Sequence, residues 1–125
     1  MYLIGKRFSF EAAHVLADLP AGHKCARLHG HTYTVEIELT ASQLVPPGFV
    51  TDFADLTPFR RYLTDTIDHR HLNEVLPVEP TSENLARHFF TWCVTHLEPG
   101  IPARISAVRV SETPQSWAEY RQEQE

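Results

Sequence analysis

Hydrophobic and polar positions alternate in two stretches near the start of the chain. Residues 7–11 read polar, apolar, polar, apolar, polar, which is the period of a half-buried strand. Residues 32–40 show the same period more clearly, and their apolar row consists of Tyr33, Val35, Ile37 and Leu39. Residues 15–28, which lie between them, contain Pro20, Gly22 and mixed polar residues that are typical of a loop. The pattern predicts two strands joined by a long loop.

The period becomes helical in the middle of the chain. Asp52 is a candidate N-cap for a helix over residues 53–67, in which Pro58 is tolerated only in the first turn or two. Thr81 is a second candidate N-cap, for a helix that Pro99-Gly100 stops. The apolar stripe of this second helix consists of Leu85, Phe89, Cys93 and Leu97.

Strand character returns after the second helix. Residues 103–112 and 115–121 are predicted to be strands, and residues 121–125 are expected to fray. The order strand, strand, helix, helix, strand, strand predicts an α+β fold with a four-stranded antiparallel sheet and two helices on one face. Such a sheet has two open edges, which often pair with another copy of the chain. We therefore expect an oligomer of a single domain that spans residues 1–125.

Composition and charge exclude several classes of protein. A chain of 125 residues with 42% apolar side chains is long enough for one domain with a real core, and is too apolar to be disordered. A net charge of −5 without a long basic run argues against binding to the phosphate backbone of a nucleic acid. No apolar run approaches the roughly 20 residues of a membrane helix, and the first seven residues do not form a signal peptide. Two cysteines make no disulfide framework, so we expect a reducing cytoplasm.

The chain contains eight histidines, an unusually high content for its length, and three of them form a candidate metal site. His29 and His31 are separated by Gly30 at the start of the second strand, so their side chains project from the same face. His14 closes the first strand segment, and a hairpin would bring it close to that face. The histidine pair alone is a weak signal, but three neutral imidazoles suit zinc and leave a fourth position open for water or substrate. The pattern predicts a zinc site made by His14, His29 and His31.

Cys25, four residues before His29, has two possible roles. It could be a fourth zinc ligand in a closed site without catalysis. It could instead be a reactive thiolate near a substrate, with its pKa lowered by nearby positive charge. Its loop position beside Lys24 and Arg27 favours the reactive thiol.

Two further groups carry possible chemistry. Asp68 and His69 are adjacent where the first helix ends, and a carboxylate beside an imidazole suits general acid–base catalysis. An ordinary histidine at a helix C-terminus explains the same pair. Glu112 shares strand phase with Val108 and Val110, so it is either a ligand anchor or the first residue past the edge of the sheet. The residue pattern leaves both questions open.

Taken together, these segments resemble the 6-pyruvoyl-tetrahydropterin synthase family, and most closely its bacterial carboxy-forming branch. The matching segments appear in family order over most of the chain: Phe-Glu-Ala-Ala-His (10–14), Gly-His-Lys-Cys-Ala-Arg-Leu-His-Gly-His (22–31), Thr-Asp-Phe-Ala-Asp-Leu (51–56), Asp-His-Arg-His-Leu-Asn (68–73), Pro-Thr-Ser-Glu-Asn-Leu-Ala (80–86) and Val-Ser-Glu-Thr (110–113). The combination of Cys25 with the two following histidines and an upstream Ala-Ala-His is highly specific.

The resemblance implies a role for each candidate residue. Zn²⁺ would be held by His14, His29 and His31, and Cys25 would be the acid–base thiol, with Asp68 and His69 completing a proton relay. Glu112 would anchor the pterin through its paired N–H groups. The resemblance also implies the tunnelling fold (T-fold), in which three subunits close their sheets into a barrel, two trimers stack into a hexamer, and active sites lie at subunit interfaces.

The resemblance further implies the reaction. A zinc-dependent lyase would convert 7,8-dihydroneopterin triphosphate to 6-carboxy-5,6,7,8-tetrahydropterin, acetaldehyde and triphosphate, on the way to queuosine or another 7-deazapurine. Thr81 and Ser82 would line the pterin pocket, and Lys24 and Arg27 are candidates for the triphosphate, although exposed loop charges explain them equally well. Two alternatives stay open: a pyruvoyl-forming enzyme that only eliminates triphosphate, and a non-catalytic zinc module.

Overall fold

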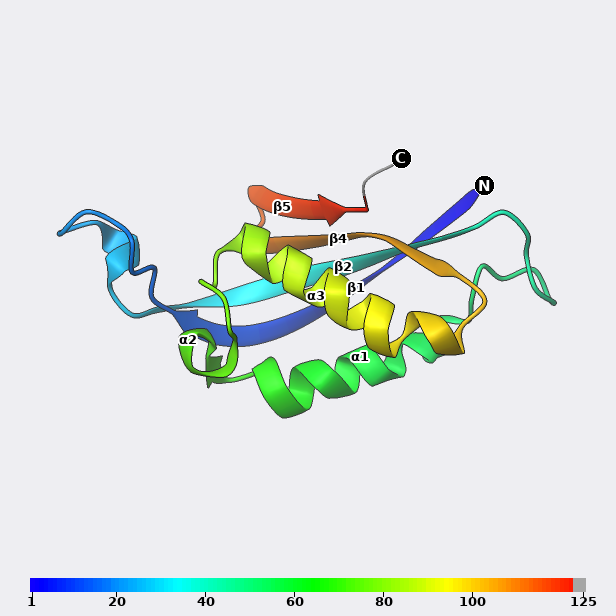
Figure 1. Cartoon of the computed structure of the whole chain (residues 1–125), viewed down its shortest axis with the longest axis horizontal. Helices are drawn as coiled ribbons and strands as arrows, with labels where there is room; N and C mark the ends of the chain where they lie inside the picture. The colour runs from blue at the N-terminus through cyan, green and yellow to red at the C-terminus, as the bar shows by residue number, and fades with distance from the viewer. Residues whose placement is uncertain (123–125) are drawn as a thin grey trace.

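A computed structural model describes residues 1–122 and shows one curved sheet with helices on one side (Figure 1). The strands are β1 (Tyr2–His14), β2 (His29–Ala41), β3 (Arg70–His71), β4 (Arg104–Thr113) and β5 (Ser116–Arg121). Their order in the sheet is β3-β1-β2-β4-β5, with all neighbours antiparallel except β3, which runs parallel to β1. The four predicted strands are therefore present.

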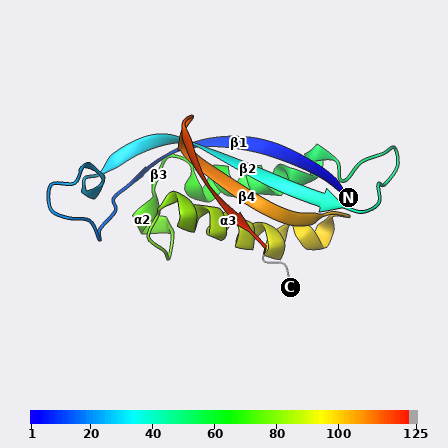
Figure 2. The same ribbon diagram turned by 90° about the horizontal axis from the view of Figure 1, so that it is seen from above.

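The helical segments cover a single face of this sheet (Figure 2). The α-helices are α1 (Thr57–Tyr62), α2 (Leu72–Val75) and α3 (Ser82–His96), and a π-turn follows α1 over Leu63–Ile67. Short 3₁₀ turns lie at Lys24–Ala26, Phe53–Leu56 and Glu98–Gly100. The long loop over residues 15–28 projects beyond one end of the sheet, and the chain's N-terminus lies at the other end.

The β1–β2 hairpin sets the register on which the site depends. Its antiparallel ladder places His14 opposite His29 and Ala12 opposite His31. Side chains alternate between the two faces of a strand, so these three histidines share the helix-covered face with the predicted apolar row of β2. All four residues of that row are fully buried, which confirms the predicted alternation: Tyr33, Val35, Ile37 and Leu39.

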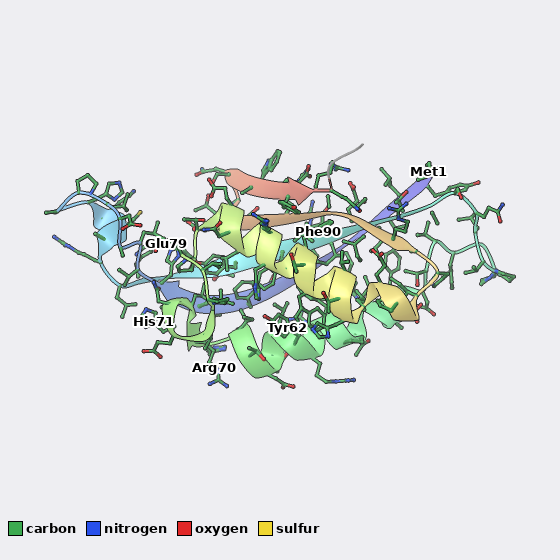
Figure 3. The ribbon with its side chains drawn as sticks, in the orientation of Figure 1. Met1, Tyr62, Arg70, His71, Glu79 and Phe90 are labelled. Carbon is green, nitrogen blue, oxygen red and sulfur yellow. The ribbon has the colours of Figure 1, made fainter. Side chains whose placement is uncertain are left out.

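The core lies between the sheet and the helices, where the side chains in Figure 3 are densest. Phe10 stacks on Tyr33 at a centroid distance of 4.9 Å, and Phe59 and Phe89 pack edge to face at 5.7 Å. The stripe predicted for the second helix is buried, including Cys93. The packed aromatic rings fix where the sheet and the helices meet, and so hold the strand ends that carry the histidines.

The first predicted helix is divided into three kinds of turn. Asp52 caps it as predicted, because its Oδ1 accepts a hydrogen bond from the Ala54 N–H at 2.9 Å. A 3₁₀ turn comes first and α1 follows, with Pro58 in the first turn of α1, where its missing N–H costs little. The π-turn closes with the Asp68 N–H donating to the Leu63 carbonyl at 2.7 Å. The helix therefore ends at the residue predicted to carry chemistry.

Three expectations about the fold need correction. The sheet has a fifth strand, β3, which the sequence did not indicate because two residues carry no detectable period. The first strand starts at Tyr2, well before residue 7, although it ends at His14 as predicted. Arg121 does not fray, since it belongs to β5 and its guanidinium pairs with Glu38 at 2.9 Å. The rest of the predicted fraying tail, residues 123–125, lies outside the described residues.

The helix-free face of the sheet is polar. Three ion pairs cross it from strand to strand: Arg7 with Glu36, Arg109 with Glu119, and Arg121 with Glu38. Arg121 also pairs with Glu119 within β5. None of the helices in the described part of the chain is long and apolar enough to cross a membrane.

Candidate active site and metal centre

Three histidine side chains converge at the end of the β1–β2 hairpin. The ligand nitrogens of His14, His29 and His31 all lie within 4.8 Å of one another. Their ring centroids are 4.4–5.0 Å apart, with interplanar angles of 66° for His14 and His29, 84° for His14 and His31, and 89° for His29 and His31. The hairpin register causes this arrangement, because it brings the last residue of β1 against the first residues of β2. The predicted metal-ligand set is therefore assembled in space.

The backbone orients two of the three rings. His14 Nδ1 lies 2.7 Å from the Pro80 carbonyl oxygen, and His29 Nδ1 lies 2.7 Å from the Arg27 carbonyl oxygen. A carbonyl oxygen only accepts, so each Nδ1 carries the proton and donates it. In the neutral ring, Nε2 then keeps its lone pair and can bind a metal. Fixing the second ring nitrogen in this way is a regular feature of metal-binding histidines.

The free ring nitrogens fit a zinc ion. Nε2 of His14 and of His31 are buried and have no hydrogen-bond partner in the structure. A buried polar atom without a partner costs free energy, and a bound cation would remove that cost. Burial lowers the pKa of His31, the neighbouring His14 and His29 lower it further, and Glu112 opposes them. The ring therefore favours the neutral form that ligates metal.

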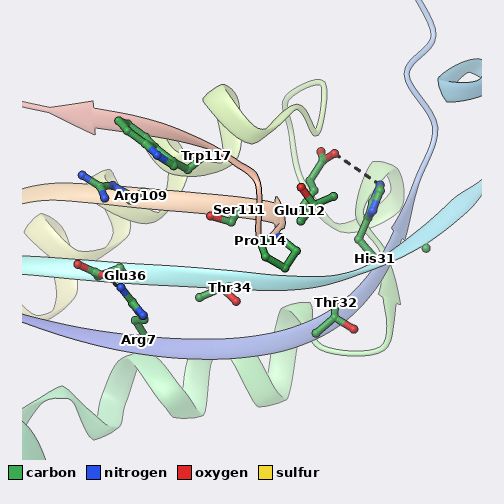
Figure 4. Close-up of a pocket in the computed structure, with 12 residues that line it drawn as sticks. Arg7, His31, Thr32, Thr34, Glu36, Arg109, Ser111, Glu112, Pro114 and Trp117 are labelled. Atoms are coloured by element: carbon green, nitrogen blue, oxygen red, sulfur yellow. Dashed lines mark hydrogen bonds and ion pairs between the residues drawn. The ribbon is translucent and has the colours of Figure 1, made fainter.

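Glu112 closes one side of the histidine cluster. Its carboxylate lies 3.6 Å from His31 Nε2 and 3.9 Å from His14 Nε2, as Figure 4 shows for the first pair. The β4–β5 register shifts between Val110 and Thr113, so Glu112 falls at a bulge, a device that often redirects side chains beside active sites. Ser82, the first residue of α3, donates a hydrogen bond to Glu112 Oε1 at 3.1 Å. Glu112 is thus positioned in the site, as an inward-facing carboxylate.

Tyr33 forms the floor of the cluster, a role that the sequence did not indicate. The ring is fully buried and lies 5.5 Å from His31 and 5.9 Å from His14, edge to face with both. Its hydroxyl has no hydrogen-bond partner within residues 1–122, and burial together with the nearby Glu112 raises its pKa. Tyr33 therefore stays a neutral phenol beneath the histidines. In the sequence it reads only as one more apolar position of the strand.

Asp68 and His69 lie side by side at the free edge of β1. Asp68 Oδ2 is 3.1 Å from His69 Nδ1, and Asp68 Oδ1 accepts a hydrogen bond from the Glu11 N–H at 2.8 Å. The Glu11 bond and the contact with His69 lower the pKa of Asp68, so it is a carboxylate at neutral pH. His69 has a positive φ of 60°, held by its N–H donating to the Glu11 carbonyl at 2.6 Å. Non-glycine residues rarely adopt this conformation, which concentrates at functional sites.

Two grooves meet at His31. The larger, with a volume of 730 Å³, runs over the helix-free face from His31 and Glu112 to Arg109 and Trp117 (Figure 4). The other, of 510 Å³, is lined by His31, Gly30 and His69 among others. His31 of the histidine cluster and His69 of the Asp68–His69 pair therefore line the same groove. Cavities of this size suit a small organic ligand.

The thiol of Cys25 is not part of the histidine cluster. Among the described residues, the candidate metal group consists of the three histidines alone. Cys25 lies in the 3₁₀ turn of the 15–28 loop, is partly exposed, and its N–H donates to His23 Nδ1 at 3.0 Å. In this geometry the Cys25 thiol is not a fourth member of the ligand group.

The other predicted substrate residues have different positions. Thr81 is the N-cap of α3, and its Oγ1 accepts a hydrogen bond from the Asn84 N–H at 3.1 Å. Ser82 faces Glu112, as described above. Lys24 and Arg27 are exposed on the projecting loop near Cys25. The fold therefore brings Ser82 into the site, uses the Thr81 hydroxyl for capping, and leaves the two cations on the loop.

Several residues that shape the site had no predicted role. The carbonyls of Pro80 and Arg27 orient two histidines, and Glu11 holds both Asp68 and His69 through its backbone. Backbone groups leave no trace in residue types, so no pattern could have found them. Asn73 belongs to the segment 68–73, and membership of that segment was its only signal.

Comparisons with known proteins agree with this geometry. The family described as 6-pyruvoyl tetrahydropterin synthase matches residues 3–123 of the chain. A Synechocystis protein named 6-carboxy-5,6,7,8-tetrahydropterin synthase is 36% identical over 96% of this chain and 93% of its own length. A Haemophilus influenzae protein of the same name is 30% identical over 98% of this chain and 100% of its own.

A solved structure extends the agreement to the fold. The structure of Caenorhabditis elegans 6-pyruvoyl tetrahydropterin synthase superposes with a TM-score of 0.83 at 27% identity, over 98% of this chain and 96% of that one. The T-fold implied by the resemblance is therefore confirmed for the chain. From the near-complete match in sequence and fold, the chain belongs to the 6-pyruvoyl tetrahydropterin synthase family and is an enzyme of the lyase class.

Proposed function

We propose that the chain is a zinc-dependent lyase that converts 7,8-dihydroneopterin triphosphate to 6-carboxy-5,6,7,8-tetrahydropterin, acetaldehyde and triphosphate. The product would feed the synthesis of queuosine or another 7-deazapurine in the cytoplasm. The names of the Synechocystis and Haemophilus relatives support the carboxy product. The single observation that carries the proposal is the convergence of three histidines, two of which, His14 and His31, have a buried Nε2 without a hydrogen-bond partner among the described residues, beside a carboxylate and an Asp–His pair.

His14, His29 and His31 would hold the zinc ion. When bound, zinc acts as a Lewis acid that acidifies the C–H and O–H groups of the substrate side chain. The protein supplies the rest of the site. The Pro80 and Arg27 carbonyls keep the rings in one tautomer and orientation, and Tyr33 seals the cluster from the core.

Glu112 would hold the pterin ring. The paired N–H groups of the ring's amidine-like edge match a carboxylate bidentately, as a guanidinium does. Glu112 reaches the groove mouth beside His31, and Ser82 restrains one of its oxygens. The ring would therefore be fixed with its side chain close to the histidine cluster.

Cys25 and His69 would move protons on opposite sides of that side chain. Asp68 is ionised, hydrogen-bonded to the backbone and in contact with His69, so it orients the imidazole. Lys24 and Arg27 lie on the loop that carries Cys25 and could meet the triphosphate, while Thr81 would line the pocket only through its backbone. Redox change within the substrate needs no nicotinamide.

A single substitution separates the enzyme from a non-catalytic zinc module. Cys25→Ala should retain one zinc ion per chain and lose at least about 100-fold in turnover, the range of general acid–base catalysis. Cys93→Ala is the matched control, because Cys93 is buried in the core away from the site. Loss of zinc from Cys25→Ala, with no turnover in the parent protein, would establish the closed zinc module instead.

Product analysis separates the two enzymatic alternatives. Incubation with 7,8-dihydroneopterin triphosphate should release acetaldehyde and a 6-carboxy pterin in equal amounts. A product that retains the three-carbon side chain, without acetaldehyde, would assign the chain to the pyruvoyl-forming reaction.

A further inference from the structure

Three consecutive residues just after His14 are each held by a different partner. Val15, Leu16 and Ala17 leave the end of β1 and start the loop that carries Cys25. Such a stretch would ordinarily be loose, because it has left the sheet. Here every N–H in the stretch has an acceptor: those of Val15 and Ala17 come from distant parts of the chain, and that of Leu16 comes from the other arm of the same loop.

Asn73 holds the first of these residues. The Val15 N–H donates to Asn73 Oδ1 at 2.9 Å, and Asn73 Nδ2 donates to the Val15 carbonyl at 2.8 Å. The side-chain amide therefore pairs with both backbone groups of one residue, as a neighbouring strand would. It continues the short β1–β3 pairing one step beyond His14.

Leu16 links this stretch to Cys25. The Leu16 N–H donates to the Cys25 carbonyl at 3.0 Å. This bond joins the two arms of the loop across nine residues. The position of the Cys25 backbone therefore follows the position of Leu16.

Glu79 holds the third residue. The Ala17 N–H donates to Glu79 Oε1 at 2.6 Å. Glu79 is itself fixed, because its carbonyl accepts hydrogen bonds from the Thr81 N–H at 2.9 Å and from Asn84 Nδ2 at 3.0 Å. The carboxylate is thus anchored to the start of α3, next to the Pro80 carbonyl that orients His14.

We propose that Asn73 and Glu79 are positioning residues that place the Cys25 thiol relative to the histidine cluster. Their side chains hydrogen-bond to Val15 and Ala17, the residues on either side of Leu16. The hydrogen bond from Leu16 to the Cys25 carbonyl then restrains Cys25. The same segment, residues 73–81, fixes His14 through Pro80, so one piece of chain sets both the metal side and the thiol side of the site. Both residues act on the reaction through Cys25, and neither touches the substrate.

This inference rests on the proposed catalytic role of Cys25, so the test has one arm that does not require activity. Asn73→Ala and Glu79→Ala are compared with Glu74→Ala, a neighbouring change in α2 at a largely exposed side chain. Iodoacetamide labelling is followed separately at Cys25 and Cys93. We expect the labelling rate at Cys25 to change at least threefold in the two positioning variants and not in Glu74→Ala, while buried Cys93 stays protected in all.

Zinc content and kinetics form the second arm. Both positioning variants should keep one zinc per chain and a KM within about twofold of the parent, with kcat reduced at least tenfold. In a Cys25→Ala background, the same substitutions should cause no further loss, because residues that act through one group are not additive. Asn73→Asp and Glu79→Gln keep an oxygen acceptor for the clamped N–H and should recover part of kcat.

The outcomes separate the two proposals. Unchanged Cys25 labelling would overturn the positioning role, because the thiol would then be independent of Asn73 and Glu79. Labelling of Cys93 to the same extent as Cys25 would also overturn it, because it would indicate general unfolding. Loss of zinc from Asn73→Ala would show that it acts through His14 instead. A parent protein without turnover whose Cys25 labelling still depends on Asn73 and Glu79 would overturn the proposed function and leave the positioning intact.

Discussion

Among single residues, Asp68 makes the stability of the folded protein depend on pH. Its carboxylate accepts a backbone hydrogen bond from Glu11 and faces His69, which together lower its pKa. A carboxyl group with a lowered folded-state pKa stabilises the protein above its unfolded value, about 3.9, and this contribution disappears as the pH falls through the folded value. Stability should therefore depend on Asp68 at neutral pH and not in strong acid.

Asp68→Asn tests this dependence. The amide keeps an oxygen to accept the Glu11 N–H and loses the charge, so we expect about 1 kcal/mol less stability at pH 7. Urea unfolding of both proteins at pH 7 and at about pH 3 measures the difference. The gap should close at the lower pH, and an equal gap at both pH values would contradict the role of the charge.

Some residues of the site could be predicted from the sequence and others could not, because only some of them leave a local signal. His14, His29 and His31 could be found because a strand has a period of two and a hairpin joins its ends. Tyr33 was missed because a buried aromatic residue looks the same whether it faces a core or a metal site. The positive φ of His69 could not be predicted at all, since it comes from tertiary pairing with Glu11.

At the scale of elements, α3 holds the site through its first residues. Thr81 caps the helix, and Ser82, the next residue, reaches Glu112. The cap and the carboxylate contact are one residue apart, so the helix N-terminus restrains one oxygen of Glu112, which β4 carries. The periodicity of this helix and its cap were predictable, because both signals are local.

Thr81→Ala should cost about 1 kcal/mol of stability, the usual cost of a lost N-cap. Thr81→Ser is the matched control, because it keeps the hydroxyl that accepts the Asn84 N–H. Thermal unfolding of the three proteins checks the ranking. We expect a KM for the pterin substrate close to that of the parent in both variants, and a large rise in KM for Thr81→Ala with unchanged stability would assign the hydroxyl to the substrate instead.

The other elements show where local signals end. The first helix changes from 3₁₀ to α to π turns, and this division depends on Pro58 and on how Asp68 meets β1. Strand β3 forms because its two residues pair with Ala12 and Ala13, although two residues are too few to show an alternation of polar and apolar positions. Tertiary contact decided both features, and no window of sequence contains that contact.

At the scale of the whole molecule, the sheet presents two free edges. In the described residues, β3 pairs only with Ala12 and Ala13, which leaves most of β1 open on that side, and β5 has no neighbour on its outer side. Exposed strand edges pair readily with further strands. Large exposed residues lie at the start of β1, at the end away from β3: Met1, Tyr2 and Leu3.

We expect light scattering to give a mass three or six times the 14.3 kDa of the chain, as the trimers and hexamers of the proposed T-fold assembly require. Replacing Leu3 with Glu should shift the mass towards the monomer and reduce activity in proportion, because active sites at subunit interfaces need a neighbour. An active monomer would contradict the interface location of the sites.

The strand-crossing ion pairs of the helix-free face have a consequence for how such an assembly could hold together. That face carries arginine and glutamate pairs, with Trp117 beside Arg109, so it has little apolar surface to bury against a neighbouring subunit. A barrel closed from three copies would enclose a hydrated, charge-balanced channel, and its cohesion would come from backbone pairing at the seams. Assembly would then show a small heat-capacity change for its size, since little apolar surface leaves water.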